Sequence, residues 1–382
     1  MPLELRDEEN QFLLDRREHG LTGGTLVVGA GVSGLSTALA LSKRGHEVTV
    51  LERGLSGSES SWAGGGILSP LLPWDYTVPV TKLALLSMDG YAGWVAEIET
   101  IANQCAEFWR CGMLALDVTA PDQAVAWCMT NGIAVVRGIP AGIPPLPSLL
   151  LEKGRDSVWL PEVAQVRNPR LVAALRAAVV RLGGVIREQC PATGVLTQGN
   201  RVTAVRTTTE TFPAHSVVLA TGAWSGLGLT GLAPTPNMRP IRGQMLLFKL
   251  EPGALDKILY RNGLYLIPRR DGHVLVGSTL EDAGFDKSTD DATRQRLHAE
   301  AAELLPALTA IQPVRHWAGL RPGSPDNIPI IDRHPDFENV FVNTGHYRYG
   351  VTLAPASAEL LVDMMENRTP ALDHAPYRWQ AG

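Results

Sequence analysis

The chain has 382 residues, of which 45% are hydrophobic and 19% charged, a composition typical of a folded globular protein long enough for two domains. Its formal net charge of −5 provides no basic field for nucleic acid or an anionic membrane, so the composition favours a small-molecule partner. The four cysteines lack metal-site spacing and are too few for a disulfide framework, so we expect no metal and a reducing cytoplasm.

The N-terminal segment, residues 1–21, is rich in charged residues and lacks the apolar core of a signal peptide. We expect it to be a mobile tail. No run in the sequence approaches the roughly 20 apolar residues that cross a bilayer, so no membrane association is predicted.

The segment "TLVVGAGVSGLSTALALSKRGHEVTVLE" predicts a strand–helix–strand unit. The first strand covers residues 25–28, the helix runs to Lys43, and the second strand ends at Glu52. Units of this order open the dinucleotide-binding domains of Rossmann type.

The three glycines of this unit stand where each has a physical role. Gly29 makes the tight turn, Gly31 lets the backbone approach a pyrophosphate, and Gly34 lets helix and sheet pack closely. The pyrophosphate then lies at the helix N-terminus, and Glu52 can accept hydrogen bonds from a ribose diol. FAD and NAD share the adenosine diphosphate half, so this fingerprint does not choose between them.

The following segment, "SGSESSWAGGGILSPLLPWDY", favours FAD. Its hydroxyls, Ser60 and Ser61, precede three glycines that suit a backbone lying against phosphates and a flat ring, although an ordinary flexible loop would have a similar composition. The stretch "ESSWAGGGILSPLLPW" resembles the flavin-contacting loop of the glycine oxidases of thiamine biosynthesis, within the FAD-dependent D-amino acid oxidase family.

The patterns further along predict both more α/β structure and a separate sheet. A helix is expected from Asn168 to the glycines at 183 and 184, strands meeting at residues 199 and 200 follow it, and a buried strand lies within 214–226. Residues 237–315 alternate apolar and polar side chains around "NG" and "DG" turns, which predicts an antiparallel sheet.

These patterns predict two interleaved domains. The expected FAD-binding domain is α/β and Rossmann-like, and it combines residues 22–90, 155–236 and 316–372. The expected substrate domain is α+β, holds an antiparallel sheet, and combines residues 91–154, which include a helix and a proline-rich stretch, with 237–315. Residues 373–382 are expected to be a C-terminal tail. This interleaving resembles the fold shared by p-hydroxybenzoate hydroxylase and the D-amino acid oxidases.

Three residues outside the FAD-binding motifs are candidates for substrate binding. Arg321 lies in "HWAGLRPG", and although an arginine in a turn is usually a solvated charge, the resemblance implies that it grips the substrate carboxylate. A planar guanidinium suits that role because it binds a carboxylate bidentately and keeps its charge. By the same resemblance Tyr265 orients the carboxylate and walls the pocket, and Leu280 stands where the family often has methionine.

The stretch "GHYRYGVTLAPASAELL", residues 345–361, predicts a glycine turn followed by a helix. The helix N-terminus can point toward the pyrimidine end of a flavin, where reduced flavin carries negative charge. The turn resembles the family pattern "GHxRNG", which implies that Arg348 lies near the substrate and that the backbone of 346–352 lies against the flavin. Tyr349 stands where asparagine is usual, a departure that concerns rate or substrate preference more than the cofactor.

The resemblance therefore implies a non-covalent FAD and a small amino acid substrate. The residues expected to hold FAD are Gly29, Gly31, Val32, Ser33, Gly34, Glu52, Arg53, Ser60, Ser61, Gly65, Gly66, Ile67, Ala192, His346, Tyr347, Arg348, Tyr349, Gly350, Val351 and Thr352.

The implied reaction is oxidative deamination of glycine, sarcosine or small D-amino acids. Hydride passes to flavin N5, and O2 reoxidises the flavin, so that the products are the oxo acid, ammonia and hydrogen peroxide. No catalytic side chain beyond the flavin is expected. The resemblance also implies a cytoplasmic homotetramer whose imine product feeds thiazole formation.

Four alternatives stay open at this point. A covalent-flavin sarcosine oxidase would need a cysteine in the C-terminal half, whereas the last cysteine is Cys190. A D-amino acid dehydrogenase that passes electrons to a membrane quinone would need an apolar or basic patch that the sequence does not show. The loop after Glu52 disfavours an NAD-linked dehydrogenase. A flavin-binding scaffold without turnover would be told apart by the absence of peroxide on addition of amine.

Overall fold

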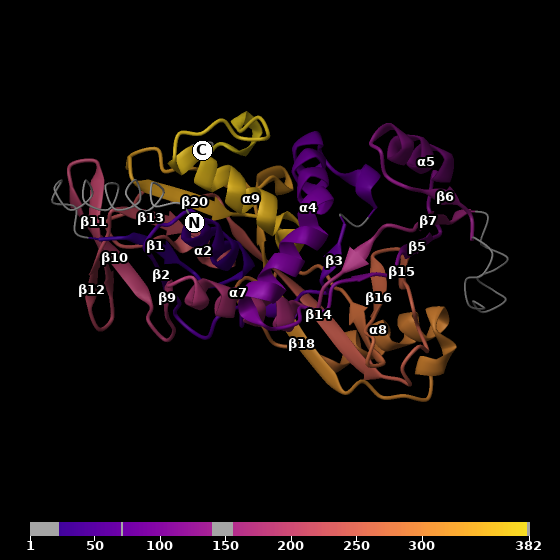
Figure 1. Ribbon diagram of the computed structural model, residues 1–382. Coiled ribbons are helices and arrows are strands. Elements are labelled where there is room, and N and C mark those ends of the chain that lie inside the picture. Colours follow the sequence, from indigo (N-terminus) through magenta and orange to yellow (C-terminus); the bar gives the residue numbers. More distant parts are fainter. Residues whose placement is uncertain (1–22, 70–71, 140–155, 380–382) are drawn as a thin grey trace.

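The computed structural model describes residues 23–69, 72–139 and 156–379, and it contains two main sheets, one toward each end of the molecule (Figure 1). The predicted N-terminal tail, residues 1–21, and most of the proline-rich stretch lie outside the described residues. Within the described ranges, no helix has both the length and the apolarity needed to cross a bilayer.

The first sheet has six strands in the order β19-β20-β13-β1-β2-β9 and is parallel except for β19. Its central strand β1 is buried at all four positions, as a strand covered on both faces requires. Its strands are β1 (Thr25–Val28), β2 (Val48–Leu51), β9 (Val185–Arg187), β13 (Ser216–Leu219), β19 (Ile330–Arg333) and β20 (Val340–Thr344). The predicted strand–helix–strand unit is confirmed, with β2 ending one residue before Glu52.

Four helices build the core against this sheet: α2 (Val32–Lys43), α4 (Val78–Ala102), α7 (Asn168–Arg181) and α9 (Gly350–Met365). The Tyr91 hydroxyl of α4 donates to the Val351 carbonyl oxygen at 3.0 Å, so α4 holds the first turn of α9. The helix predicted within 91–154 begins at residue 78, and its apolar face, including Val95 and Ile98, joins the core of α2, α7 and α9. Residues 91–102 therefore pack with the six-stranded sheet, not with the substrate domain as predicted.

The second sheet has eight strands in the order β18-β14-β17-β16-β15-β5-β7-β6, and only β15 and β5 pair in parallel. Turns at Asn262–Gly263 and Asp271–Gly272 connect β15 to β16 and β16 to β17, as predicted. The strands are β5 (Met113–Leu116), β6 (Val136–Arg137), β7 (Val158–Leu160), β14 (Arg239–Lys249), β15 (Ile258–Arg261), β16 (Leu264–Pro268), β17 (His273–Gly277) and β18 (Arg315–Gly323).

Two helices lie beside this sheet, α5 (Pro121–Thr130) and α8 (Asp291–Leu304). The sequence analysis predicted only strands for 237–315, but Asp290 caps α8 by accepting a hydrogen bond from the Thr293 N–H at 2.8 Å. Leu297 and Leu304 of α8 pack against Phe248 and neighbouring residues of the sheet. A helix-former-rich segment with an N-cap therefore interrupts the strand pattern.

Shorter elements complete the fold. A three-stranded sheet contains β10 (Ala192–Gln198), β11 (Arg201–Thr207) and β12 (Thr211–Pro213), and the predicted turn at 199–200 joins β10 to β11. Another three-stranded sheet pairs β3 (Ile67–Leu68) and β4 (Trp109–Arg110) with β8 (Ala164–Gln165), and α3 covers Ser60–Ala63. Single 3-10 turns cover Pro73–Asp75, Gly222–Leu227, Pro306–Leu308, Pro325–Asn327 and Ala375–Tyr377.

Sheet pairing moves two of the predicted domain boundaries, and packing onto α4 changes the expected C-terminal tail. β7 and β18 were predicted in the FAD-binding domain, but both pair within the eight-stranded sheet. The described part of the predicted C-terminal tail packs back onto α4, where the Tyr377 hydroxyl donates to the Pro79 carbonyl oxygen at 2.8 Å. Long-range strand pairing and packing, which local sequence patterns do not specify, set these boundaries.

Gly34 allows α2 to pack closely on the turn that follows β1, and this contact should contribute to the stability of the protein. A Cβ at this position would overlap the Gly29 carbonyl oxygen, so we expect Gly34→Ala to lower the free energy of unfolding by about 1–3 kcal/mol. In contrast, Gly90→Ala on the exposed face of α4 meets open space and should raise it by about 0.5–1 kcal/mol. Urea unfolding of both variants checks this; equal effects would contradict the tight contact.

Candidate active site

A cavity lies at the carboxyl ends of β1 and β2, where parallel sheets of this kind bind ligands. We call it the β1 cavity; Gly29, Gly31, Glu52, Arg53 and Ala192 are among the residues that line it. Gly29 has φ +106°, and a Cβ there would lie 2.5 Å from the Ala220 carbonyl oxygen, so only glycine fits. Gly34 does not line the cavity but permits the turn.

Glu52 is held rigidly at the edge of this cavity. Its Oε2 accepts the Ala30 N–H at 2.8 Å, and its Oε1 accepts the Gly54 N–H at 2.9 Å. Each carboxylate oxygen keeps a further lone pair, so the group can still accept hydrogen bonds from a diol. This geometry fits the predicted ribose contact.

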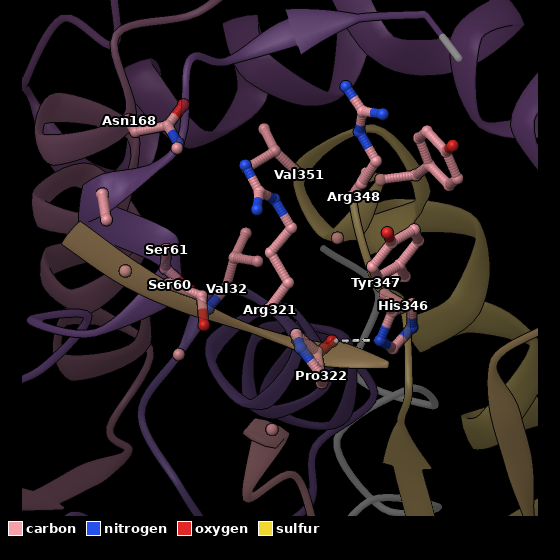
Figure 2. Close-up of a pocket in the computed structure, with 18 of the residues that line it drawn as sticks. Val32, Ser60, Ser61, Asn168, Arg321, Pro322, His346, Tyr347, Arg348 and Val351 are labelled. Atoms are coloured by element: carbon pink, nitrogen blue, oxygen red, sulfur yellow. Dashed lines mark hydrogen bonds between the residues drawn. The ribbon is translucent and has the colours of Figure 1, made fainter. Parts of the chain in front are cut away.

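A second cavity lies between the two main sheets (Figure 2). We call it the intersheet cavity. It shares Gly31, Ser60, Ser61, Ala220 and Gly222 with the β1 cavity, so the two are continuous. Together they fit an elongated ligand with a nucleotide at one end and a ring system at the other.

The loop predicted to contact the flavin lines the junction of the two cavities. The Ser61 Oγ accepts the Val32 N–H at the start of α2 at 2.9 Å, and the Ser60 hydroxyl donates to the Leu320 carbonyl oxygen. Gly65 packs so closely on Ile267 that a Cβ would clash with it. The loop therefore ties the start of α2 to the eight-stranded sheet, and Gly65, Gly66 and Ile67 line the intersheet cavity as predicted.

Arg269 supports this loop from behind, a role that the sequence analysis missed. Its Nη2 donates to the Gly65 carbonyl oxygen at 2.8 Å, and its Nη1 donates to the Val166 carbonyl oxygen at 2.9 Å. Burial, together with the charge of Arg167, lowers the pKa of this guanidinium to about 10. Arg269 thus remains charged at neutral pH while it holds the loop backbone.

The turn before α9 forms another wall of the intersheet cavity. Tyr347 has φ +48°, a backbone conformation that residues other than glycine rarely adopt. Its N–H donates to the Pro322 carbonyl oxygen at 3.0 Å. The ring of His346 lies with Nδ1 3.2 Å from the Ser33 hydroxyl (Figure 2). Burial lowers the pKa of His346 to about 4, so it is neutral at pH 7.

Tyr349 and the start of α9 continue this wall. Tyr349 is 2% exposed, and its ring packs edge to face on Tyr76 with centroids 4.6 Å apart. Gly350 and Val351 line the cavity, so the positive end of the α9 dipole faces it. Thr352 differs from the prediction: it is buried outside the cavity lining, and its hydroxyl donates to the Ile67 carbonyl oxygen at 3.0 Å.

Arg321 extends into the intersheet cavity between the Ser60–Ser61 turn and Tyr347 (Figure 2). Its Nη2 donates to the Ser278 hydroxyl at 2.6 Å, and its Nη1 donates to the Thr279 carbonyl oxygen at 3.2 Å. Within the described residues it forms no ion pair with a carboxylate, and desolvation lowers the pKa of its guanidinium. An enclosed cation with only neutral partners is suited to bind an anion.

Of the other three predicted substrate residues, Tyr265 and Arg348 line the intersheet cavity and Leu280 does not. Tyr265 lines the same cavity, with its hydroxyl 3.9 Å from the Met245 sulfur. Arg348 also lines it. Leu280 does not: it is 53% exposed and lines a neighbouring pocket, which Arg348 borders as well. The prediction that Leu280 binds the substrate therefore does not fit this exposed position outside the intersheet cavity.

Unpaired polar atoms support the fit of a flavin in the intersheet cavity. The side-chain amide of Asn168, the Oδ1 of Asn343 and the Nε2 of His346 are buried and lack hydrogen-bond partners among the described residues, and all three residues line the cavity. A ring system edged with donors and acceptors would satisfy such groups. The residues present thus fit FAD across the two cavities.

Sequence analysis missed several of these residues. Asn168 was predicted only as a helix start, and Asn343, Ser278 and Gly243 were not singled out. Gly243 matters because a Cβ there would clash with the Arg321 guanidinium. A glycine inside an apolar strand signals such close approach, and a buried asparagine in β20 signals a polar ligand. Among the described residues, no cluster of His, Cys, Asp or Glu could hold a metal ion.

Comparison with known proteins agrees with this geometry. Residues 25–364 match the DAO family, described as FAD dependent oxidoreductases. The chain is 43% identical over 364 residues to a glycine oxidase of Pseudomonas aeruginosa, covering 92% of this chain and 97% of that protein. It is 32% identical over 376 residues to the bifunctional protein ThiO/ThiG of a Nostoc species, covering 94% of this chain and 55% of that protein.

The fold agrees as well. The crystal structure of glycine oxidase from Geobacillus kaustophilus matches with a TM-score of 0.86 at 27% identity, covering 94% of this chain and 98% of that one. The L-proline dehydrogenase of P. horikoshii matches in fold alone, with a TM-score of 0.82 at 20% identity, covering 93% of this chain and 97% of that one.

These matches confirm the predicted fold class and decide between FAD and NAD, which the glycine fingerprint left open. The chain is therefore a member of the DAO family of FAD-dependent, amine-oxidising oxidoreductases.

Proposed function

We propose that this enzyme oxidises glycine and other small amines, such as sarcosine and small D-amino acids, to the oxo acid, an amine and hydrogen peroxide; the amine released is ammonia from glycine or a primary D-amino acid and methylamine from sarcosine. One observation carries the proposal: the Arg321 guanidinium lies in the intersheet cavity without a carboxylate partner among the described residues. A substrate carboxylate would supply the missing anion and place its own Cα near the ring-binding part of the cavity.

The chain's own residues have few roles beyond positioning. Arg321 binds the carboxylate, Tyr265 walls the site beside it, and Arg348 adds positive charge at the same cavity. His346 is engaged with Ser33 and 3% exposed, which argues against a general base. A bound FAD would supply the redox chemistry, namely the two-electron oxidation of the amine at Cα and the reduction of O2 to hydrogen peroxide, and water would hydrolyse the resulting imine.

The biological setting follows from the relatives. Proteins named glycine oxidase and ThiO/ThiG match over most of this chain, which supports a role in supplying the glycine imine for thiamine biosynthesis. We further propose, from the family resemblance alone, that the enzyme is a homotetramer in the cytoplasm.

The direct test follows the flavin absorbance of the purified holoenzyme without oxygen while glycine, sarcosine, D-alanine and D-proline are added separately. We expect glycine to bleach the flavin band, and air to restore it with release of peroxide. Bleaching by another of these amines but not glycine would change the substrate. If none of these amines bleaches the flavin band, the oxidation of small amines is refuted, and a flavin-binding scaffold without turnover is favoured.

Arg321→Lys tests the carboxylate contact. Lysine keeps the charge but loses the two-point geometry, so we expect kcat/KM for glycine to fall by about 30- to 5000-fold, which corresponds to about 2–5 kcal/mol. Acetate, which has a carboxylate and no amine, should also perturb the flavin spectrum of the variant only at higher concentration. Arg201→Lys on the surface strand β11 serves as the control. Unchanged acetate affinity in Arg321→Lys would argue against this contact.

Tyr349→Asn tests whether this tyrosine restricts the substrate. Removing a ring that is buried against Tyr76 at the cavity wall enlarges the site, so we expect the ratio of kcat/KM for D-proline to that for glycine to rise about tenfold or more. The ratio is insensitive to the fraction of folded enzyme. Tyr349→Phe keeps the ring and should keep the wild-type ratio. If Tyr349→Asn also keeps it, the tyrosine does not set substrate size.

A further inference from the structure

The segment 281–288, between β17 and α8, reaches from the eight-stranded sheet to the β1 cavity. Phe285 stacks on Trp224 with ring centroids 5.6 Å apart and an interplanar angle of 27°. Trp224 lines the β1 cavity, and the Arg53 guanidinium lies 3.6 Å from the centroid of its ring. Phe285, from a segment that follows the eight-stranded sheet, thus packs on Trp224, a residue that lines the β1 cavity.

A chain of charges joins the same two parts. The Lys287 Nζ lies 3.1 Å from the Glu59 Oε2, and the Glu59 Oε1 lies 3.0 Å from the Arg53 Nη2. Both Glu59 and Arg53 line the β1 cavity. Lys287 itself does not line the β1 cavity. It therefore acts on the cavity rim through its ion pair with Glu59.

The base of the segment is fixed to its own sheet. Arg242 of β14 pairs with Glu281 and, through Nη1, with the Asp286 carboxylate at 2.6 Å. Asp286 in turn accepts the Ser288 N–H at 2.8 Å. The segment is thus held in shape at its base, while the contacts at its tip are more open: the Lys287 side chain is 47% exposed and Phe285 is 42% exposed.

We propose that residues 281–288 form a strap that closes the nucleotide half of the FAD site, and that FAD leaves the enzyme only when the Phe285 and Lys287 contacts break. The dinucleotide fingerprint does not include these residues, because they come from the opposite sheet. Weak, solvent-exposed contacts suit such a strap, since each can break without unfolding either sheet.

The test measures the rate at which FAD leaves the diluted holoenzyme, followed by the rise in flavin fluorescence on release, at low and at high salt and without any amine. We expect Phe285→Ala to speed release about two- to tenfold and Phe285→Leu to speed it less, because stacking is lost while apolar volume is kept. Lys287→Met should speed release about two- to fivefold at low salt and remove much of its salt dependence.

Lys43→Met is the matched control. It removes a lysine–glutamate pair with Nζ 2.7 Å from the Glu97 Oε2, comparably exposed and joining two helices away from the strap. We expect the control to release FAD at the wild-type rate. Release as fast from Lys43→Met as from Lys287→Met, or release at the wild-type rate from both Phe285→Ala and Lys287→Met, would overturn the proposal. Because no amine is present, the outcome does not depend on whether glycine is the substrate.

Discussion

The enclosed guanidinium of Arg321 is the constraint on which the site depends. A cation removed from water loses solvation that neutral acceptors replace only in part. Ser278 and Thr279 accept hydrogen bonds from it, and Gly243 leaves the space it occupies, but no described carboxylate neutralises it. Arg321 lies where β14 and β18 face the six-stranded sheet, so the pairing of these strands would set the position of the substrate carboxylate that we propose it binds.

The other charged and dipolar groups around the intersheet cavity also make its electrostatic potential positive. The N-termini of α2 and α9 both border it, Arg348 adds a second guanidinium, and no carboxylate is found among the described residues lining the intersheet cavity. Such a field favours negative charge on a bound ring and disfavours an ammonium group beside it. An amine must be neutral before its Cα can lose a hydride, so the field that would hold the proposed carboxylate would also favour the reactive form of the substrate.

The sequence predicted those features of the site that depend on residues close together in the chain. Gly29, Gly31 and Glu52 form a short-range pattern, and the structure brings them to one cavity. Sequence reasoning failed where the determinant is a distant partner. The membership of β18 in the eight-stranded sheet and the support from Arg269 both depend on tertiary contacts. Leu280 shows the limit of transfer from a resemblance, since aligned positions in a loop need not point into the same space.

The two-sheet arrangement would couple the binding of the cofactor to the placement of the candidate substrate residues. The β1 cavity belongs to the six-stranded sheet, whereas Arg321 and Tyr265 stand on the eight-stranded one, and the continuous cavities cross the boundary between them. A ligand that fills both cavities therefore contacts both sheets and stabilises their relative placement by its own binding energy. Direct contacts between the two parts, such as Ser60 with Leu320 and Phe285 with Trp224, reinforce this placement. Small shifts between the sheets would alter the position of Arg321 relative to the ring, so contacts remote from the substrate contribute to the geometry of hydride transfer.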